Sequence, residues 1–376
     1  MRLLVACDKF KGSLGAPEAC EAVAEGLREG WIGALPEIEC LPIADGGDGI
    51  AETLLAASGG EWVECQVRGP LGSPVTAGYA LIENGRTAVI EMAKASGIVL
   101  VGEEEKDPLR ATTYGTGQLI LDAMRRGVGE ILLGIGGSAT NDGGTGMAEA
   151  LGFRFEDDAG TLLADLPVHL GRAARLLHPD KTTFPKVTVA CDVTNPLLGP
   201  DGCTRVYGPQ KGIRPEDFEA HESRLAHLVT LTGPHGENAA LLPGSGAAGG
   251  LGFGARVFLD AALVPGFDLV SSRIGLADAV AAADLVITGE GRLDSQSLQG
   301  KGPHGVVRLA RSLGKKTAAF CGSLENRALE EEFGPILEIR NDSLDLATNL
   351  ARGREHLWEA ARHFGQTLSS HSSDPV

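Results

Sequence analysis

The chain has 376 residues, 43% of them hydrophobic, and a formal net charge of −17. This composition excludes a chain that is disordered over most of its length, and the length predicts two to three domains. The negative charge disfavours nucleic acid and anionic membrane surfaces as partners. The seven cysteines include no Cys-x-x-Cys pair, so we expect free thiols in a cytoplasmic protein. Glycine is frequent, with 53 residues, which predicts loops whose backbone approaches a ligand.

Strand and helix patterns alternate at both ends of the chain. Near the N-terminus we expect strands over residues 3–7 and 38–43 and helices over 17–28 and 50–57. After residue 264 we expect helices over 274–283 and 305–313 and strands over 284–288, 316–320 and 336–340. Such alternation is typical of a parallel sheet with right-handed crossovers.

The middle of the chain has a different pattern. Short strands are expected over residues 62–67, 75–82 and 87–92, and Asn84-Gly85 is a strong hairpin signal. Further helices are expected over 116–126, 146–151 and 216–231, and strands over 130–135 and 187–191. Antiparallel hairpins do not belong inside a doubly wound sheet, so we predict an inserted domain.

The predicted fold class is α/β. A Rossmann/flavodoxin-like parallel-sheet domain, residues 1–60 plus 264–365, is split in sequence by a second α/β domain with antiparallel hairpins, residues 61–263. Residues 366–376 are polar and are expected to form a frayed tail.

Charged, glycine-rich segments follow the predicted strands of the split domain. They are residues 8–13, 45–49, 289–294, 300–302 and 321–323. Ligands bind at the carboxyl ends of strands in open α/β sheets, so these segments form the expected site. Carboxylates there suit Mg²⁺ or a substrate proton, while Lys, Arg and glycine N–H groups suit a transferred phosphate. The alternative is that these residues serve only as caps and turns.

The inserted domain has a second candidate after the strand 130–135. The loop from Gly136 to Gly144 leads into a helix, which is a pattern for an anion site at a helix N-terminus. Gly134-x-Gly136-x-x-Ala139 also matches a dinucleotide fingerprint, with acids at Glu156 and Asp157, but those acids lie in a polar turn. The fingerprint leaves one alternative function, a nicotinamide-dependent hydroxy-acid oxidoreductase. A non-catalytic sugar-acid-binding protein is a second alternative.

Seven ordered blocks within residues 1–365 share the pattern of one known family. The blocks are residues 8–14, 42–49, 111–117, 134–146, 191–197, 208–212 and 288–292. Together they resemble the bacterial glycerate kinase family (type-1 glycerate kinases, glycerate 2-kinase). Cys7, Lys9 and Asp48 depart from the residues usual in that family, so position 9 is given no role.

The resemblance implies a kinase that uses ATP and Mg²⁺ to phosphorylate a hydroxyl of D-glycerate, with 2-phosphoglycerate and ADP as expected products. It agrees with the split fold. It leaves open which hydroxyl is the acceptor, which domain holds ATP, which residue is the base, the oligomeric state and the tolerance for related hydroxy acids.

We assign site roles from the chemistry of the residues. The expected catalytic residues are Asp8, Lys11, Asp45, Asp192 and Arg292, with Asp45 and Asp192 as metal ligands. The expected substrate-binding residues are Gly12, Ser13, Gly46, Gly47, Asp48, Glu290, Asp294 and Lys301. The expected nucleotide-binding residues are Gly136, Gly137, Ser138, Thr140, Asn141, Gly143 and Gly144.

Overall fold

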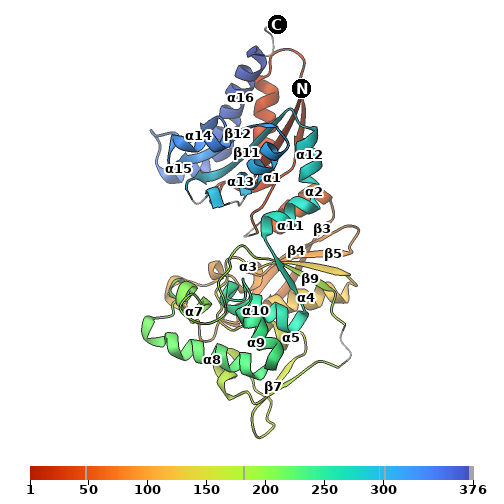
Figure 1. Cartoon of the computed structure of the whole chain (residues 1–376), viewed down its shortest axis with the longest axis vertical. Helices are drawn as coiled ribbons and strands as arrows, with labels where there is room; N and C mark the ends of the chain where they lie inside the picture. Colours follow the sequence, from red (N-terminus) through yellow and green to blue (C-terminus); the bar gives the residue numbers. More distant parts are fainter. Residues whose placement is uncertain (47–48, 181–182, 296, 300–301, 372–376) are drawn as a thin grey trace. The chain divides into compact units, whose positions relative to one another are not determined.

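The computed structural model describes residues 1–46, 49–180, 183–295, 297–299 and 302–371. The chain forms two compact units (Figure 1). The split unit comprises Met1–Asp45, Glu52–Ala57 and Phe267–Val376, and the inserted unit comprises Gly46–Ala51 and Ser58–Gly266. The unit boundaries therefore fall inside helix α2 (Ile50–Ser58) and at the start of helix α11 (Gly266–Arg273). Within the described ranges, no helix combines the length and apolar character needed to cross a membrane.

The split unit contains a five-stranded, wholly parallel sheet with the order β13-β12-β11-β1-β2. Its strands are β1 (Arg2–Cys7), β2 (Glu37–Cys40), β11 (Leu285–Leu293), β12 (Lys316–Leu324) and β13 (Ile336–Glu338). The chain leaves β1 toward one edge of the sheet and leaves β11 toward the other. The strand order therefore reverses between β1 and β11, and the predicted doubly wound α/β fold is confirmed.

Helices cover both faces of this sheet because successive strand residues point to opposite sides. Leu3 and Val5 of β1 pack with α1 (Ala16–Gly30) and α16 (Gly353–His371). Leu4 and Ala6 pack with α12 (Leu276–Ala282) and α13 (Gly302–Ser312). The remaining helices are α14 (Glu330–Phe333) and α15 (Leu346–Ala351). Because α16 continues to His371, residues 366–371 of the expected frayed tail are helical.

The inserted unit contains a mixed six-stranded sheet with the order β10-β9-β6-β5-β4-β3. Its strands are β3 (Glu61–Arg68), β4 (Pro74–Ile82), β5 (Thr87–Glu91), β6 (Glu130–Gly134), β9 (Lys186–Ala190) and β10 (Ala262–Val264). Strands β3, β4 and β5 pair antiparallel, and the pairs from β5 to β10 are parallel. The expected β4–β5 hairpin is present, with Asn84 in the left-handed region at φ 58°. A separate two-stranded sheet joins β7 (Arg154–Glu156) and β8 (Arg175–Leu177).

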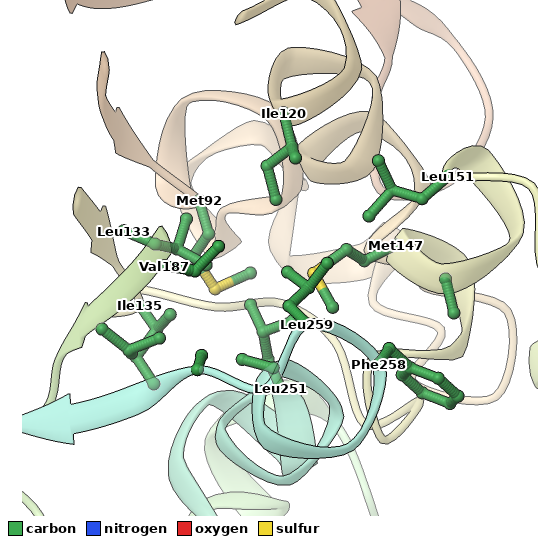
Figure 2. Packing of buried hydrophobic residues seen from close by; sticks show 14 of the residues in the cluster. Met92, Ile120, Leu133, Ile135, Met147, Leu151, Val187, Leu251, Phe258 and Leu259 are labelled. Carbon is green, nitrogen blue, oxygen red and sulfur yellow. The ribbon is translucent and has the colours of Figure 1, made fainter. Parts of the chain in front are cut away.

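The core of the inserted unit lies between this sheet and its helices. The helices are α3 (Ala93–Ser96), α4 (Tyr114–Arg125), α5 (Thr145–Ala150), α6 (Leu166–His169), α7 (Cys203–Tyr207), α8 (Phe218–Leu231), α9 (Gly233–Leu241) and α10 (Ala247–Leu259). Figure 2 shows Leu133 and Val187 of neighbouring strands near Met92, with Met147 and Leu251 supplied by α5 and α10. Full burial of each such side chain contributes about 1.5–3 kcal/mol. This packing holds β6 and α5 in place, and the predicted nucleotide loop joins them.

Helices α1 and α16 of the split unit approach closely because α1 carries glycine where they meet. A Cβ atom on Gly26 would overlap the carbonyl oxygen of Trp358, and one on Gly30 would overlap that of Arg362. The two backbones are therefore in direct contact, and no larger residue fits at either position without separating the helices.

We expect Gly26→Ala to destabilise the protein. Alanine is favoured over glycine inside a helix by about 1 kcal/mol, but here its methyl group would separate α1 from α16, at a cost of about 1–3 kcal/mol. The control is Gly129→Ala, at an exposed glycine whose Cβ would be no closer than 4.0 Å to its neighbours. Urea denaturation gives both free energies of unfolding. A Gly26→Ala protein as stable as the control would contradict the close contact.

Candidate functional site

Two acidic residues occupy the carboxyl edge of the split unit at the point where the strand order reverses. Asp8 directly follows β1, and its N–H donates to the carbonyl oxygen of Gly289 in β11 at 2.8 Å. Glu290 is the next residue of β11. This is the position at which open α/β sheets bind ligands.

The segment that carries Glu290 differs from the sequence prediction. Residues 289–293 were expected to form a loop, but they extend β11, which pairs with β12 from Leu285–Lys316 to Leu293–Leu324. The extended ends of β11 and β12 are in direct backbone contact, since a Cβ atom added at Gly322 would overlap the carbonyl oxygen of Gly291. Glu290 is therefore held by a rigid strand, which fixes its carboxyl group better than a loop would.

The carboxyl groups at this edge repel one another. Burial, and then the carboxylate of Asp45, raise the pKa of Asp8 to about 7 against the opposing effect of Lys9, whose N–H donates to Asp8 Oδ1 at 2.6 Å. Burial also raises the pKa of Glu290 to about 7, and the carboxylates of Asp8, Asp45 and Asp294 add to this increase. A hydrogen bond with Ser297 acts in the opposite direction. The structure thus brings together three of the predicted residues, Asp8, Asp45 and Glu290.

These carboxyl groups fit a hard cation such as Mg²⁺. Glu290 Oε1 is buried and has no hydrogen-bond partner among the described residues. A positive ion or a proton would relieve both this unsatisfied oxygen and the repulsion. Within the described ranges, no group of three or more His, Cys, Asp or Glu side chains is arranged to hold a metal ion by itself. Mg²⁺ is commonly held by one or two carboxylates together with substrate phosphates.

The other predicted residues of the split unit lie on the two segments that continue from Asp8 and from Glu290. Lys11 and Ser13 line a neighbouring cavity of about 270 Å³. The hydroxyl of Ser13 donates to the carbonyl oxygen of Leu350 at 2.6 Å. Gly12 adopts φ 79°, a conformation that favours glycine. Arg292 Nε lies 3.1 Å from Asp294 Oδ2, and the Arg292 side chain is 66% exposed.

In the inserted unit, Asp192 and Gly46 meet at the carboxyl edge of the sheet. Asp192 follows β9, and its Oδ1 accepts a hydrogen bond from the N–H of Gly266 at 2.9 Å. Gly46 adopts φ 97°, and a Cβ atom there would lie 2.6 Å from Asp192 Oδ2. The two predicted metal ligands belong to different units, Asp45 to the split unit and Asp192 to the inserted unit. Gly47, Asp48 and Lys301 lie outside the described residues.

The N-terminus of α5, which follows the predicted nucleotide loop, is capped by Asp142, a side chain of the loop itself. The carboxylate of Asp142 is buried and accepts hydrogen bonds from Thr113 N at 2.8 Å, Gly144 N at 3.0 Å and Gly146 N at 3.2 Å. Burial raises the pKa of Asp142, and these donors oppose that change. The N-terminus of α5 therefore already binds an anion supplied by the chain, which argues against Gly143 and Gly144 as phosphate ligands. The side chain of Asn141 is likewise buried, donating to Thr204 Oγ1 at 3.2 Å.

The dinucleotide fingerprint lacks its structural context. A dinucleotide site requires the helix after the loop to lead into a parallel strand beside the first one. Here α5 leads instead into β7, which pairs antiparallel with β8 in the separate small sheet. Glu156, at the end of β7, lies 3.1 Å from the guanidinium of Arg175. The nicotinamide alternative therefore loses the observation on which it rested.

Lys211 is a residue of this loop region that the sequence analysis did not select. Its side chain is 3% exposed, and its Nζ donates to Ser138 Oγ and to the Thr140 carbonyl oxygen, both at 2.7 Å. Burial lowers the pKa of Lys211 to about 8, against the opposing effect of Cys203 and Asp142. Thr140 Oγ1 is buried without a hydrogen-bond partner in the described part of the chain. Lys211 therefore cross-links this loop at Ser138 and Thr140 from a buried position. Its sequence signal was the block 208–212.

The carboxyl cluster predicts an unusual pH dependence of stability in metal-free buffer. The pKa of Asp8 rises from 3.8 to about 7 on folding. The folded state therefore holds an extra proton between these values, and the stability that this proton contributes is lost as the pH rises toward 7. The Asp8→Asn substitution removes this loss of stability at rising pH. Its stability relative to wild type should increase from about pH 4 to about pH 7, reaching about 2–4 kcal/mol, and stay constant above.

Urea denaturation across this pH range, with EDTA present, measures the difference. Asp278→Asn is the control, because Asp278 is an exposed aspartate on α12. It should keep a constant offset from wild type. If Asp8→Asn did the same, Asp8 would not be a repelled, buried carboxyl group.

The doubly wound sheet with carboxyl groups at its reversal point defines an α/β protein of the class whose members bind ligands at the carboxyl edge of the sheet. The model of the "Glycerate kinase family" matches residues 3–369. The chain is 43% identical to a glycerate kinase of Halalkalibacterium halodurans over 99% of both chains. It is 41% identical to the glycerate 2-kinase of Escherichia coli over 86% of both chains. The crystal structure of the Salmonella typhimurium LT2 protein assigned as glycerate kinase 2 gives a TM-score of 0.87 at 38% identity, covering 99% of this chain and 98% of that one.

This chain belongs to the glycerate kinase family, as the seven sequence blocks predicted.

Proposed function

We propose that this protein transfers a phosphoryl group from ATP to D-glycerate with the help of Mg²⁺. The observation that carries the proposal is the pair of carboxyl groups with raised pKa values, buried Asp8 and half-buried Glu290, at the carboxyl edge of the split unit. Phosphoryl transfer needs a divalent cation beside the phosphates and a group that accepts the proton of the attacking hydroxyl. The family membership of the chain supports the same reaction.

The carboxyl cluster suits both roles. Bound Mg²⁺ would neutralise the charge that develops on the transferred phosphoryl group, and Asp8 and Glu290 are the residues that would hold it together with the substrate phosphates. A carboxyl group with a pKa of about 7, such as Asp8 or Glu290, is poised to accept a proton near neutral pH. The neighbouring exposed cations, Lys11 and Arg292, provide the positive charge that a phosphate requires.

We further propose the 2-hydroxyl as the acceptor and the cytoplasm as the location. The relative from Escherichia coli is named glycerate 2-kinase, which supports 2-phosphoglycerate as the product. All seven cysteines of the chain are free thiols, in keeping with a reducing compartment.

The product identifies the function. Incubation of the protein with ATP, Mg²⁺ and D-glycerate should give one new phosphomonoester, which phosphorus NMR distinguishes as 2-phosphoglycerate or 3-phosphoglycerate by comparison with standards. We expect 2-phosphoglycerate and an equal amount of ADP. Accumulation of 3-phosphoglycerate would overturn the choice of hydroxyl, and the absence of any phosphoglycerate would overturn the function. Reduced-nicotinamide absorbance with the same acid should not change.

Mg²⁺ should stabilise the protein through the carboxyl cluster. At pH 8, where Asp8 and Glu290 are mostly ionised, we expect MgCl₂ to raise the Tm of the wild-type protein, because a ligand of the folded state stabilises it. The increase should be much smaller in Asp8→Asn and in Glu290→Gln. Differential scanning calorimetry measures it without substrate. Asp278→Asn is the matched control and should respond as wild type does. Equal Mg²⁺ responses in all four proteins would place the cation elsewhere.

A further inference from the structure

The split unit contains a cavity of about 270 Å³ to which no ligand has yet been assigned. Its base is formed by the ends of three neighbouring strands, at Gly291 of β11, Gly322 of β12 and Ile339 just beyond β13. Phe10 and Lys11, from the segment after β1, lie on one side. The cavity therefore opens at the same edge of the sheet as the carboxyl cluster.

The opposite wall is held in place by its own hydrogen bonds. The side-chain amide of Asn349 donates to the carbonyl oxygens of Asn341, Leu344 and Asp345, each at 3.0 Å. Ser13 Oγ donates to the carbonyl oxygen of Leu350, which ties α15 to the segment after β1. A pocket with a wall fixed in this way loses little conformational entropy when a ligand binds.

By area the lining is mostly apolar, and its polar residues include Lys11, Arg340, Asn349 and His356. Phe10 is buried, whereas Leu346 at the rim is 74% exposed and would become covered by a bound ligand. The imidazole of His356 also lines the cavity and can hydrogen-bond to a ligand. A three-carbon hydroxy acid consists almost entirely of charged and hydroxyl groups, so it would use the polar part of this lining but gain little from the apolar part. A planar aromatic base with a sugar gains much more, and the volume is near the lower end of the range for ligand pockets, about 300–1,000 Å³.

We propose that this cavity binds the base and sugar of the nucleotide substrate, an inference that rests on the proposed kinase function. The strand geometry places the rest of the nucleotide suitably. Gly291 and Glu290 are consecutive in β11, so they lie on opposite faces of the sheet only about 3.8 Å apart along the backbone. A nucleoside beside Gly291 can therefore extend its phosphates past Lys11, along the side of β11 that β1 no longer pairs beyond Gly289, toward Glu290 and Asp8.

This proposal moves the nucleotide from the loop predicted by the sequence to the split unit. The N-terminus of α5 is closed by Asp142, and the α5 helix has six residues. The cavity, by contrast, combines apolar walls, an imidazole and a lysine at the position where doubly wound sheets bind ligands.

The test uses Leu346→Glu, with Leu313→Glu as its matched control. Both leucines are exposed residues of the split unit, at 74% and 42%, so both proteins should fold. Leu313 lies just before β12, at the opposite edge of the sheet. A carboxylate at position 346 would be exposed to the base and repel the phosphates. We expect the KM for ATP to increase about tenfold, equivalent to about 1.4 kcal/mol, with little change in the KM for D-glycerate. Leu313→Glu should match wild type in both.

A second variant and a direct binding measurement complete the test. His356→Ala should also raise the KM for ATP, and calorimetric titration with ADP should show weaker binding for both His356→Ala and Leu346→Glu than for Leu313→Glu. If the wild-type protein phosphorylates glycerate but both variants keep the wild-type KM for ATP and affinity for ADP, the cavity is not the nucleotide site. The same holds if only the KM for D-glycerate rises. If the wild-type protein binds ADP in this pattern but makes no phosphoglycerate, the cavity assignment stands and the proposed function fails.

Discussion

Burial of the carboxyl groups of Asp8 and Glu290, to which the charge of Asp45 adds, is the physical constraint around which the edge of the split unit is organised. Burying like charges together destabilises the folded state unless a proton or a cation enters. The pKa of Asp8 is raised to about 7 even though Lys9 opposes the increase, and the pKa of Glu290 is raised to about 7 as well. Strongly perturbed carboxyl groups at a ligand-binding edge are typical of functional sites.

The sheet makes this arrangement possible by fixing the backbone on both sides of the cluster. The hydroxyl of Thr288 donates to the Ala6 carbonyl oxygen at 2.7 Å, which adds a side-chain bond to the β1–β11 pairing. Beyond Gly289, β11 continues with support from β12 on one side only. Because the strands are held in register, Asp8 and Glu290 cannot move apart to relieve their repulsion. The stability of the folded sheet thus maintains an acidic site that the side chains alone would not maintain.

The sequence predicted the order of the elements well, because buried strands appear as short apolar runs such as Leu3–Cys7. It misplaced the end of β11, since the pattern Gly-Glu-Gly-Arg has low strand propensity and only the pairing with β12 makes it extended. It also could not find Lys211, which is 73 residues away from its partner Ser138. A contact of that kind depends on the tertiary fold and leaves no local periodic signal.

The glycine content shows where composition was informative and where it was not. The abundance of glycine was interpreted as backbone approaching a ligand, and close approach is indeed what the structure contains. In the loop after β6, however, the approaching group is the protein itself. A Cβ atom on Gly249 of α10 would overlap the carbonyl oxygen of Thr140, and one on Gly144 would lie 2.9 Å from the Cα of Gly254. Glycine therefore lets α10 pack directly on this loop, against the Thr140 carbonyl oxygen to which Lys211 donates. Composition alone indicates that backbone comes close to something; the fold decides whether that is a ligand or another segment of the chain.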